Sequence, residues 1–273
     1  MLFKTLRDAY KLLSKEISQF EAGEIIASAT GKSRSELPVF WDDPLSEEQM
    51  KAIEDILSRR LAGEPLQYIL GEWEFYGYPF IVGEGVLIPR PDTEILVETA
   101  LEVISSLESP KVLDLCSGSG AVAIAIDKEN KSADVTAVEL SEKAFSFLRE
   151  NIRINSSDVH AVNADALKYK HHEKLDLIVS NPPYIRSGDI EGLQKEVKKE
   201  PAMALDGGED GLFFYSRFPK LYYNCLNNSG VIAFEIGIGQ EKEVAGFLES
   251  AGFRNVQFRK DLSGIIRVVL AEK

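Results

Sequence analysis

The segment Asn181-Pro182-Pro183-Tyr184 holds the residues best suited to chemistry in this 273-residue chain. Two consecutive prolines remove two N–H donors and fix two φ angles, so the turn is stiff. The Asn181 side-chain carbonyl and the Pro182 backbone carbonyl become a rigid pair of acceptors that can hold the two hydrogens of a planar –NH₂ group. Pro-Pro alone would merely end a strand. With Asn181 before it and Tyr184 after it, the turn predicts a site that positions an amide or amino nitrogen, with catalytic Asn181, Pro182 and Tyr184 and with Pro183 beside them.

A second group of candidates surrounds a glycine-rich turn that follows a buried strand. The turn contains Cys116, Ser117, Gly118, Ser119 and Gly120. Its glycines let the backbone bend sharply and approach a ligand closely before the next helix begins. This turn predicts a binding site for a nucleotide-like ligand.

Acidic residues stand at three successive strand ends, namely Asp114, Glu139 and Asp165. Asp114 is placed to fix a polar group of a ligand, Glu139 can accept hydrogen bonds from two ribose hydroxyls, and Asp165 can reach an adenine amino group. Together they fit a nucleoside lying across a sheet. Two alternatives stay open: Gly118 to Ala123 also fits the dinucleotide pattern of a nicotinamide enzyme, and any one of these acids can be a plain helix cap.

These candidates require a parallel sheet, because ligands bind where its strands end. Strands and helices alternate from residue 111 onward, which predicts a mostly parallel, doubly wound, Rossmann-like α/β domain. The expected strands are 111–116, 135–140, 160–165, 175–180 and 230–237, followed by an antiparallel pair at 255–261 and 264–272; the expected helices are 121–129, 141–155, 209–226 and 240–250.

The first 70 residues predict a small helical bundle. One apolar face runs through Leu2, Phe3, Leu6, Tyr10, Leu13 and Ile17, and a short helix over 21–29 stops at Gly31. Ser46 with Gln49 forms a capping box that opens a third helix. Its expected buried residues are Met50, Ile53, Ile56, Leu57 and Leu61.

Aromatic and β-branched residues over 73–90 predict a hairpin connector, and Pro91 suits the first turn of a helix. We therefore expect three parts: a helical domain over 1–72, the connector over 73–90, and a catalytic domain over 91–273.

Composition narrows the possible partners. The net charge is −13 and both the first 89 residues and the remainder are acidic, which weighs against a nucleic-acid substrate because phosphate binding needs a basic footprint. No apolar run approaches the roughly 18 residues of a membrane span, and the N-terminus lacks signal-peptide features. Two cysteines and three histidines predict neither a disulfide framework nor a metal site, so a cytoplasmic protein is expected.

Several segments together carry a family resemblance. They are EPLQYILGEWEFYG (64–77), LIPRPDTEILVE (87–98), DLCSGSG (114–120), SNPPYI (180–185), EPAMALDGGEDGLFFY (200–215) and FEIG (234–237). With them the chain resembles the HemK/PrmC release-factor glutamine methyltransferases, within the class I S-adenosylmethionine-dependent enzymes. Cys116 stands where that family often has glycine.

The resemblance implies roles for individual residues. Cys116 to Gly120 would wrap the methionine part of S-adenosylmethionine, Glu139 would hold its ribose, and Asp165 with Ala166 would border its adenine. Asn181 to Tyr184 would hold the substrate amide, with Asn181 also near the methyl donor. Arg90, Asp92, Thr93 and Glu94 would close the pocket, with Arg90 touching substrate. Glu235 is either a site residue or a buried, hydrogen-bonded carboxylate.

The resemblance also implies the substrate, which is the glutamine of the Gly-Gly-Gln motif in peptide chain release factors, modified on N5. Within methyltransferases the alternatives are a ribosomal-protein glutamine enzyme and an adenine-N6 or guanine-N2 enzyme, because the same tetrapeptide serves them. A nicotinamide oxidoreductase would leave Asn181 to Tyr184 unexplained. A cofactor-binding module that only docks on a partner is the non-catalytic alternative.

Overall fold

The computed structural model describes residues 3–273, which form two compact units. One unit contains the chain up to Gly71 together with Lys195–Lys199, and the other contains Glu72–Gln194 and Glu200–Lys273. The hairpin expected as a connector belongs to the second unit.

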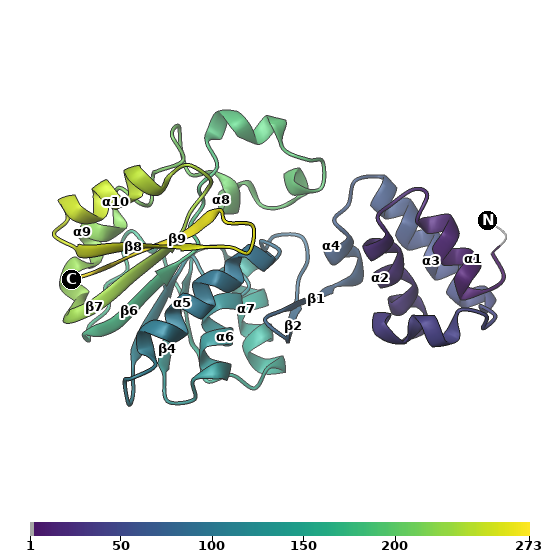
Figure 1. The fold of residues 1–273 in the computed structure, drawn as a ribbon, viewed down its shortest axis with the longest axis horizontal. Coiled ribbons are helices and arrows are strands. Elements are labelled where there is room, and N and C mark those ends of the chain that lie inside the picture. Colours follow the sequence, from purple (N-terminus) through teal and green to yellow (C-terminus); the bar gives the residue numbers. More distant parts are fainter. Residues whose placement is uncertain (1–2) are drawn as a thin grey trace. The chain divides into compact units, whose positions relative to one another are not determined.

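The first unit is helical, as expected (Figure 1). Its elements are α1 (Leu6–Leu13), α2 (Gln19–Thr30), the 3₁₀ helix η1 (Arg34–Phe40), α3 (Glu47–Leu61) and α4 (Leu66–Leu70). The capping box is confirmed, because the Ser46 hydroxyl accepts from the backbone of Gln49 and the Gln49 side chain accepts from the backbone of Ser46. Gly31 ends α2 in the left-handed conformation, as its position predicts. Leu2 lies outside the described residues.

One prediction for this unit is wrong. Ile53 and Leu57 are buried in its core, but Leu61 is 54% exposed. Leu61 is the last residue of α3 and lies beyond the positions that face the core. At the same helix end, Arg60 pairs with Glu21 and with Glu196 at 2.6 and 2.9 Å. These ion pairs hold the Lys195–Lys199 segment in the first unit.

The second unit begins with a hairpin of β1 (Glu72–Phe75) and β2 (Tyr78–Ile81). Its two-residue turn, Tyr76-Gly77, has positive φ at both positions, which matches the twist of antiparallel strands. The hairpin is shorter than predicted. Residues 82–90 leave it as irregular chain that buries Val82, Val86 and Ile88.

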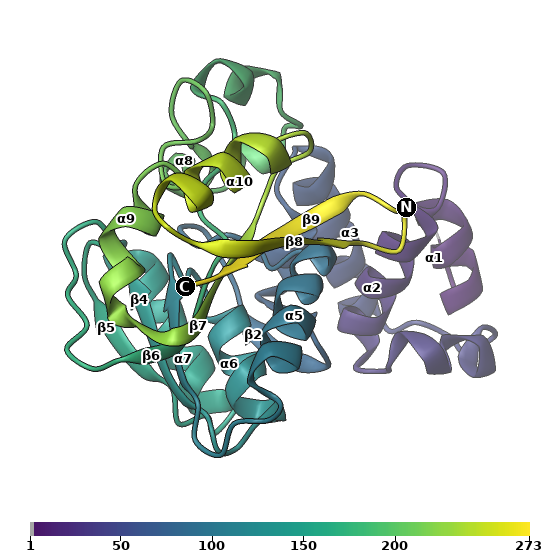
Figure 2. The same cartoon turned by 60° about the vertical axis from the view of Figure 1, so that its left-hand side comes forward.

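The main sheet has seven strands in the order β5-β4-β3-β6-β7-β9-β8. The strands are β3 (Lys111–Leu115), β4 (Asp134–Glu139), β5 (His160–Asn163), β6 (Leu175–Ser180), β7 (Leu226–Glu235), β8 (Arg254–Lys260) and β9 (Ile266–Glu272). β3 to β7 are parallel, while β9 runs antiparallel between β7 and β8. The doubly wound sheet and its terminal antiparallel pair are thus confirmed (Figure 2).

Helices cover both faces of this sheet (Figure 1). The 3₁₀ helix η2 (Pro91–Thr93) leads into α5 (Glu94–Ile104), which packs on one face with α6 (Ala121–Glu129) and α7 (Glu142–Ile154). α9 (Phe218–Tyr222) and α10 (Glu241–Ser250) pack on the other. Alternate strand residues face the two cores, for example Val112 and Leu113 of β3, as strand geometry requires.

The helix expected over 209–226 is wrong in extent. Only α9 and the 3₁₀ helix η5 (Tyr223–Cys225) form there, preceded by a short α8 (Ala202–Leu205). Gly211 has a φ of 76° that a helix does not allow, and Pro219 lacks the N–H of a helix interior. The 3₁₀ helices η3 (Ser187–Gly192) and η4 (Val197–Lys199) lie in the preceding loop. Among residues 3–273, no helix is long and apolar enough to cross a membrane.

Candidate active site

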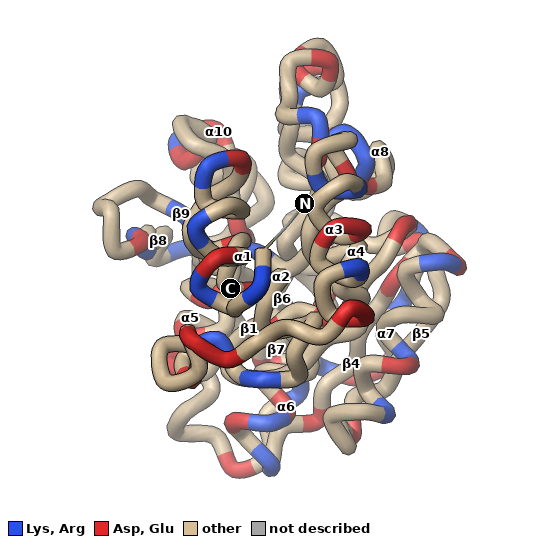
Figure 3. Tube along the Cα trace, turned by 90° about the vertical axis from the view of Figure 1, so that its right-hand side faces the viewer, with Lys and Arg blue, Asp and Glu red and all other residues tan. Residues whose placement is uncertain are grey.

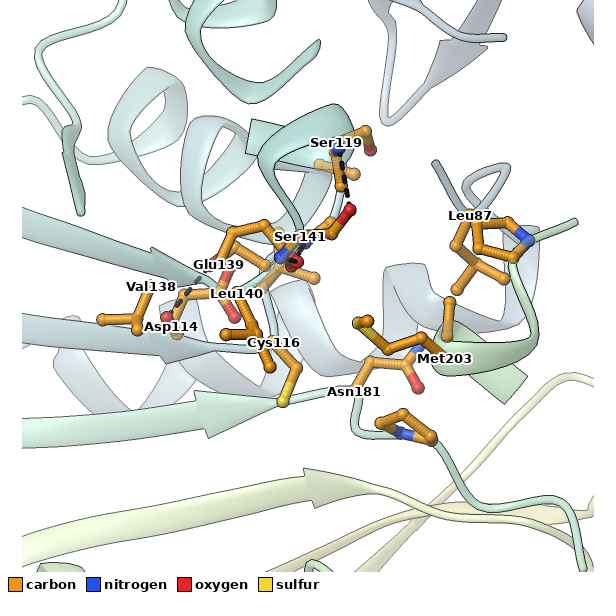
Figure 4. Close-up of a pocket in the computed structure, with 18 of the residues that line it drawn as sticks. Leu87, Asp114, Cys116, Ser119, Val138, Glu139, Leu140, Ser141, Asn181 and Met203 are labelled. Atoms are coloured by element: carbon orange, nitrogen blue, oxygen red, sulfur yellow. Dashed lines mark hydrogen bonds between the residues drawn. The ribbon is translucent and has the colours of Figure 1, made fainter. Parts of the chain in front are cut away.

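A pocket opens where the strand order reverses, at the C-terminal ends of β3, β4 and β6. This is the position that parallel α/β sheets use for ligands. Figure 4 shows Asp114, Glu139 and Cys116 at one side of it and Asn181 and Met203 at the other. The predicted site residues that line it are Arg90, Thr93, Asp114, Cys116, Ser117, Gly118, Ser119, Glu139, Asp165, Ala166, Asn181 and Pro183. Gly120, Asp92, Glu94, Pro182, Tyr184 and Glu235 are not among the lining residues.

The glycine-rich turn bends through three residues with positive φ, Cys116 (60°), Gly118 (55°) and Gly120 (83°). Cys116 therefore keeps the conformation that glycine adopts easily, at the steric cost of its Cβ. A Cβ added at Gly118 would meet no atom of the chain within 4 Å, so the pocket takes up that space. At Gly120 a Cβ would meet the Leu148 side chain of α7, so this glycine permits close helix packing.

Two carboxylates of the pocket are buried. Burial raises the pKa of Asp114 to about 7, and the Glu139 charge adds to the rise while hydrogen bonds from Ser117 and Ala123 oppose it. Within residues 3–273 its Oδ2 has no hydrogen-bond partner. Burial also raises the pKa of Glu139, although its two oxygens accept backbone N–H groups from Gly118 at 2.8 Å and Ser141 at 2.7 Å. The Glu139 carboxylate is thus held in one place facing the pocket.

The Asp165 side chain caps the turn that follows it, because it accepts a backbone N–H of that turn. β5 ends at Asn163, two residues earlier than expected, and Asp165 accepts the Leu167 N–H at 2.9 Å. That hydrogen bond, together with Lys168 nearby, lowers the pKa of Asp165. Because Asp165 still lines the pocket, capping leaves it free to contact a ligand with its remaining oxygen lone pairs.

The backbone of Asp206 and Gly207 packs against the Asn181 to Tyr184 turn and the residue after it. Ile185 forms a parallel bridge with Asp206, and the Gly207 N–H donates to the Ile185 carbonyl at 2.8 Å. A Cβ at Gly207 would lie 2.7 Å from both the Pro183 carbonyl oxygen and the Tyr184 Cα. Only glycine allows this approach. The segment around Gly207 therefore acts as a rigid backing for the turn.

Gln240 supplies a second support. Its side-chain amide donates to the Tyr184 carbonyl at 3.1 Å and to the Gly211 carbonyl at 3.2 Å, and its oxygen accepts the Gly237 N–H at 2.9 Å. Three loops are joined by one side chain in this way. Burial, followed by the Glu235 charge, raises the pKa of Tyr184 to about 12, so its ring remains neutral at physiological pH.

Of the two acceptors predicted for this turn, Asn181 lines the pocket, whereas Pro182 is buried and does not line it. Asn181 Nδ2 donates to the Thr93 hydroxyl at 3.2 Å, which leaves Oδ1 as the outward atom. From residues 3–273, neither Asn181 Oδ1 nor the Pro182 carbonyl accepts a hydrogen bond. The arrangement can hold a planar –NH₂ group beside the acids of the pocket.

The residues after Pro89 are fixed by ion pairs. Arg90 pairs with Glu200, whose side chain is 1% exposed and which also accepts the Ile88 N–H. Asp92 pairs with Arg267 of β9 at 2.7 Å, and Glu94 accepts the Tyr76 N–H. Arg90 thus reaches the pocket already neutralised by a buried carboxylate. Its most direct function is to hold this segment against Glu200.

Much of the apolar wall of the pocket was not predicted from the sequence. Leu87, Val138, Leu140, Met203 and Phe214 also line the pocket, as do Gly85, Pro89, Ala121, Val122, Ser141, Ala144, Pro201 and Ala204. Leu140 is 51% exposed and Met203 58% exposed. The position of Leu140 directly after the strand-end acid Glu139 could have indicated its role, whereas Met203 lies in the short helix α8, whose place beside the pocket no local pattern indicates.

Comparisons with known proteins agree with this architecture. Residues 4–71 match the PrmC N-terminal domain family, and residues 91–209 match the methyltransferase small domain family. A 16S rRNA N2 methyltransferase from T. thermophilus, solved with AdoMet and guanosine, superposes with a TM-score of 0.55 at 22% identity. That superposition covers 74% of this chain and 49% of the other. It shows that the two proteins share a fold.

Sequence relatives are more specific. A release factor glutamine methyltransferase from Thermodesulfovibrio yellowstonii is 40% identical over 93% of this chain and 92% of its own length. One from Fusobacterium nucleatum is 45% identical over 83% of this chain, and the aligned part spans 65% of that relative's length. The pocket, the two matched domains and these relatives together show that the chain belongs to the release factor glutamine methyltransferase family.

Proposed function

We propose that this chain transfers a methyl group from S-adenosylmethionine to N5 of the glutamine in the Gly-Gly-Gln motif of release factors. The observation that carries the proposal is the free acceptor Asn181 Oδ1, next to the stiff Pro182-Pro183 segment, at the edge of a pocket lined by the acids Asp114, Glu139 and Asp165. The names of the relatives supply the substrate.

The pocket fits S-adenosylmethionine by its own chemistry. The orphaned Oδ2 of Asp114 calls for a donor from a ligand. Glu139 is held with its carboxylate toward the pocket, where ribose hydroxyls would donate to it. Leu140 and Ala166 offer apolar surface to an adenine ring, and the turn from Cys116 would surround the methionine part. When bound, the sulfonium supplies an activated methyl group.

The residues of the chain must make a poor nucleophile react. An amide nitrogen shares its lone pair with its carbonyl. Holding both of its hydrogens on Asn181 Oδ1 and the Pro182 carbonyl orients the nitrogen and favours the positive charge that develops on it. The stiffness of the turn and the supports from Gly207 and Gln240 keep the two acceptors in place. No general base is required, because methyl transfer leaves a positive charge on the amide nitrogen, and this cation is acidic enough to lose its N–H proton to water afterwards.

A protein substrate suits the charge distribution better than a nucleic acid. Lys and Arg are interspersed with Asp and Glu along the traced chain (Figure 3), and the net charge is −13. A nicotinamide enzyme would not explain the acceptor pair at Asn181. The two cysteines are free thiols, which suits a reducing compartment such as the cytoplasm.

The test is Asn181→Ala. We expect kcat for release-factor methylation to fall by about 10²- to 10³-fold, the usual loss for one transition-state hydrogen-bond group. The dissociation constant for S-adenosylmethionine, measured by calorimetry, should change far less. Asn227→Ala is the matched control, because Asn227 bonds Asp176 on the exposed surface, away from the pocket. Near-normal kcat in Asn181→Ala would contradict the assignment.

A further inference from the structure

Asn181 and Glu235 lie side by side at the ends of neighbouring strands. β6 and β7 are parallel, with Ser180 opposite Phe234, so the next residues along, Asn181 and Glu235, occupy the same level. Side chains at the same level of adjacent strands are close enough to interact. Glu235 is 2% exposed, and within residues 3–273 its Oε2 has no hydrogen-bond partner. A carboxylate with this burial beside the acceptor turn needs an explanation.

Thr93 connects the two side chains. Its hydroxyl accepts from Asn181 Nδ2 at 3.2 Å. Thr93 and Asn181 both give hydrogen-bonding support to the Glu235 carboxylate. A hydroxyl has one proton, so a Thr93 that donates to Glu235 can only accept from Asn181. This chain of donors and acceptors has one direction as long as Glu235 is ionised.

We propose that Glu235 is a positioning residue that, through Thr93, holds the Asn181 amide with its NH₂ inward and its carbonyl toward the substrate. This inference rests on the proposed function of Asn181 and assigns the group that sets its orientation. An ionised carboxylate accepts only, so it forces the Thr93 hydroxyl to donate to it. Asn181 must then donate inward, and Oδ1 remains outside to receive the substrate N–H.

Protonation of Glu235 removes this constraint. A protonated carboxyl can donate to the Thr93 oxygen, and the Thr93 hydroxyl can then donate to Asn181 Oδ1. The amide would present its NH₂ outward, where it meets the donors of the substrate amide instead of accepting from them. The acceptor that Asn181 offers to the substrate would then be lost.

The groups around Glu235 set the pH range in which its carboxylate becomes protonated. Burial raises its pKa to about 7; the Thr93 hydrogen bond, the Arg267 charge and Asn181 oppose the rise, while the Asp92 charge adds to it. Tyr184 and Tyr215 also face it, and the Tyr215 hydroxyl donates to its backbone carbonyl at 2.7 Å. Because its pKa is raised to about 7, Glu235 is half ionised near pH 7 and increasingly protonated as the pH falls below that value. The kcat of the wild type should therefore fall as the pH drops below that value.

The first experiment reads the Asn181 side chain directly. Its two NH₂ signals in a ¹⁵N-correlated NMR spectrum are assigned by their loss in Asn181→Ala. In the wild type we expect both signals to shift with one titration between pH 6 and 8, and in Glu235→Gln we expect no such titration. This readout does not depend on methyl transfer, so it tests the inference even if release factors are not the substrate. Signals that titrate equally in both proteins would overturn it.

The second experiment reads kcat against pH at saturating S-adenosylmethionine, because Asp114 also has a pKa of about 7. Glu235→Gln should lower kcat by roughly 10-fold and remove the acid limb. Thr93→Val should lower kcat by roughly 10- to 100-fold, as small misplacements of a reacting group do, and Thr93→Ser should restore it. Glu235→Gln should bind the cofactor with unchanged affinity, because Glu235 does not line the pocket.

Asp127→Asn is the matched control. Asp127 is a buried acid (3% exposed) at the end of α6, bonded to Ser157 and away from the pocket. Its variant should keep the wild-type pH profile. An acid limb that survives in Glu235→Gln, or a Thr93→Val variant with wild-type kcat, would refute the positioning role.

Discussion

Gly207→Ala tests whether the position of the turn Asn181 to Tyr184 depends on the segment around Gly207 that packs against it. The added Cβ would lie 2.7 Å from the Pro183 carbonyl oxygen and from the Tyr184 Cα, whereas ordinary contact begins at 3.4 Å. The two backbones must therefore separate by about 0.7 Å at van der Waals contact. A displacement approaching 1 Å at a reacting group can cost about 100-fold in rate. We expect kcat to fall by about 10- to 100-fold and the unfolding free energy by about 1–3 kcal/mol.

The assay is steady-state methylation of a release factor, with S-adenosylmethionine affinity measured by calorimetry and folding by thermal melting. Affinity should stay within about threefold, because Gly207 does not line the pocket. Gly188→Ala is the matched control: Gly188 lies in η3, and a Cβ there meets nothing within 4 Å. A folded Gly207→Ala protein with wild-type kcat would refute the idea that this glycine sets the position of the turn.

Two further predictions concern the cofactor side of the pocket. Cys116→Gly should preserve methylation. In denaturant unfolding the variant should be as stable as the wild type or up to about 1 kcal/mol more stable. A side chain at a φ of 60° is strained by about 1–2 kcal/mol, but the greater backbone entropy of glycine in the unfolded state offsets part of the gain. Asp114→Asn should weaken S-adenosylmethionine binding but raise the melting temperature of the ligand-free protein. The pKa of Asp114 is raised to about 7 from 3.8, so the wild type loses stability as the pH rises from about 4 to 7. The difference in melting temperature between Asp114→Asn and the wild type should therefore grow over that range. A difference that shrinks with rising pH would contradict the idea that burial of Asp114 destabilises the protein.

In both units, several elements follow from local patterns. α6 has the bounds that its apolar run predicts, and Ser46 starts α3 as its capping box requires. Strand-end residues gather at one edge because parallel strands bring their C-terminal ends together. This is why Asp114, Glu139 and Asn181 could be placed in one pocket before the fold was known.

Other features depend on contacts between distant segments. The pairing of Arg90 with Glu200 joins residues 110 positions apart, and no local pattern indicates it. The region from Gly207 onward has helix-forming residues, but Gly207 and Gly211 instead lie close to the backbone of Pro183 and Tyr184. The function of Glu235 follows from the register of β6 against β7, which cannot be known until the strand order is known.

The central claim is tested most directly by mass spectrometry of the product. The wild-type protein is incubated with a release factor and S-adenosylmethionine carrying a labelled methyl group, and the peptide that contains Gly-Gly-Gln is sequenced by fragmentation. We predict one labelled methyl group on the glutamine side chain, and initial labelling about 10²- to 10³-fold slower with Asn181→Ala under the same conditions. Label on a ribosomal protein or a nucleic acid, with an unmodified release factor, would contradict the proposed substrate.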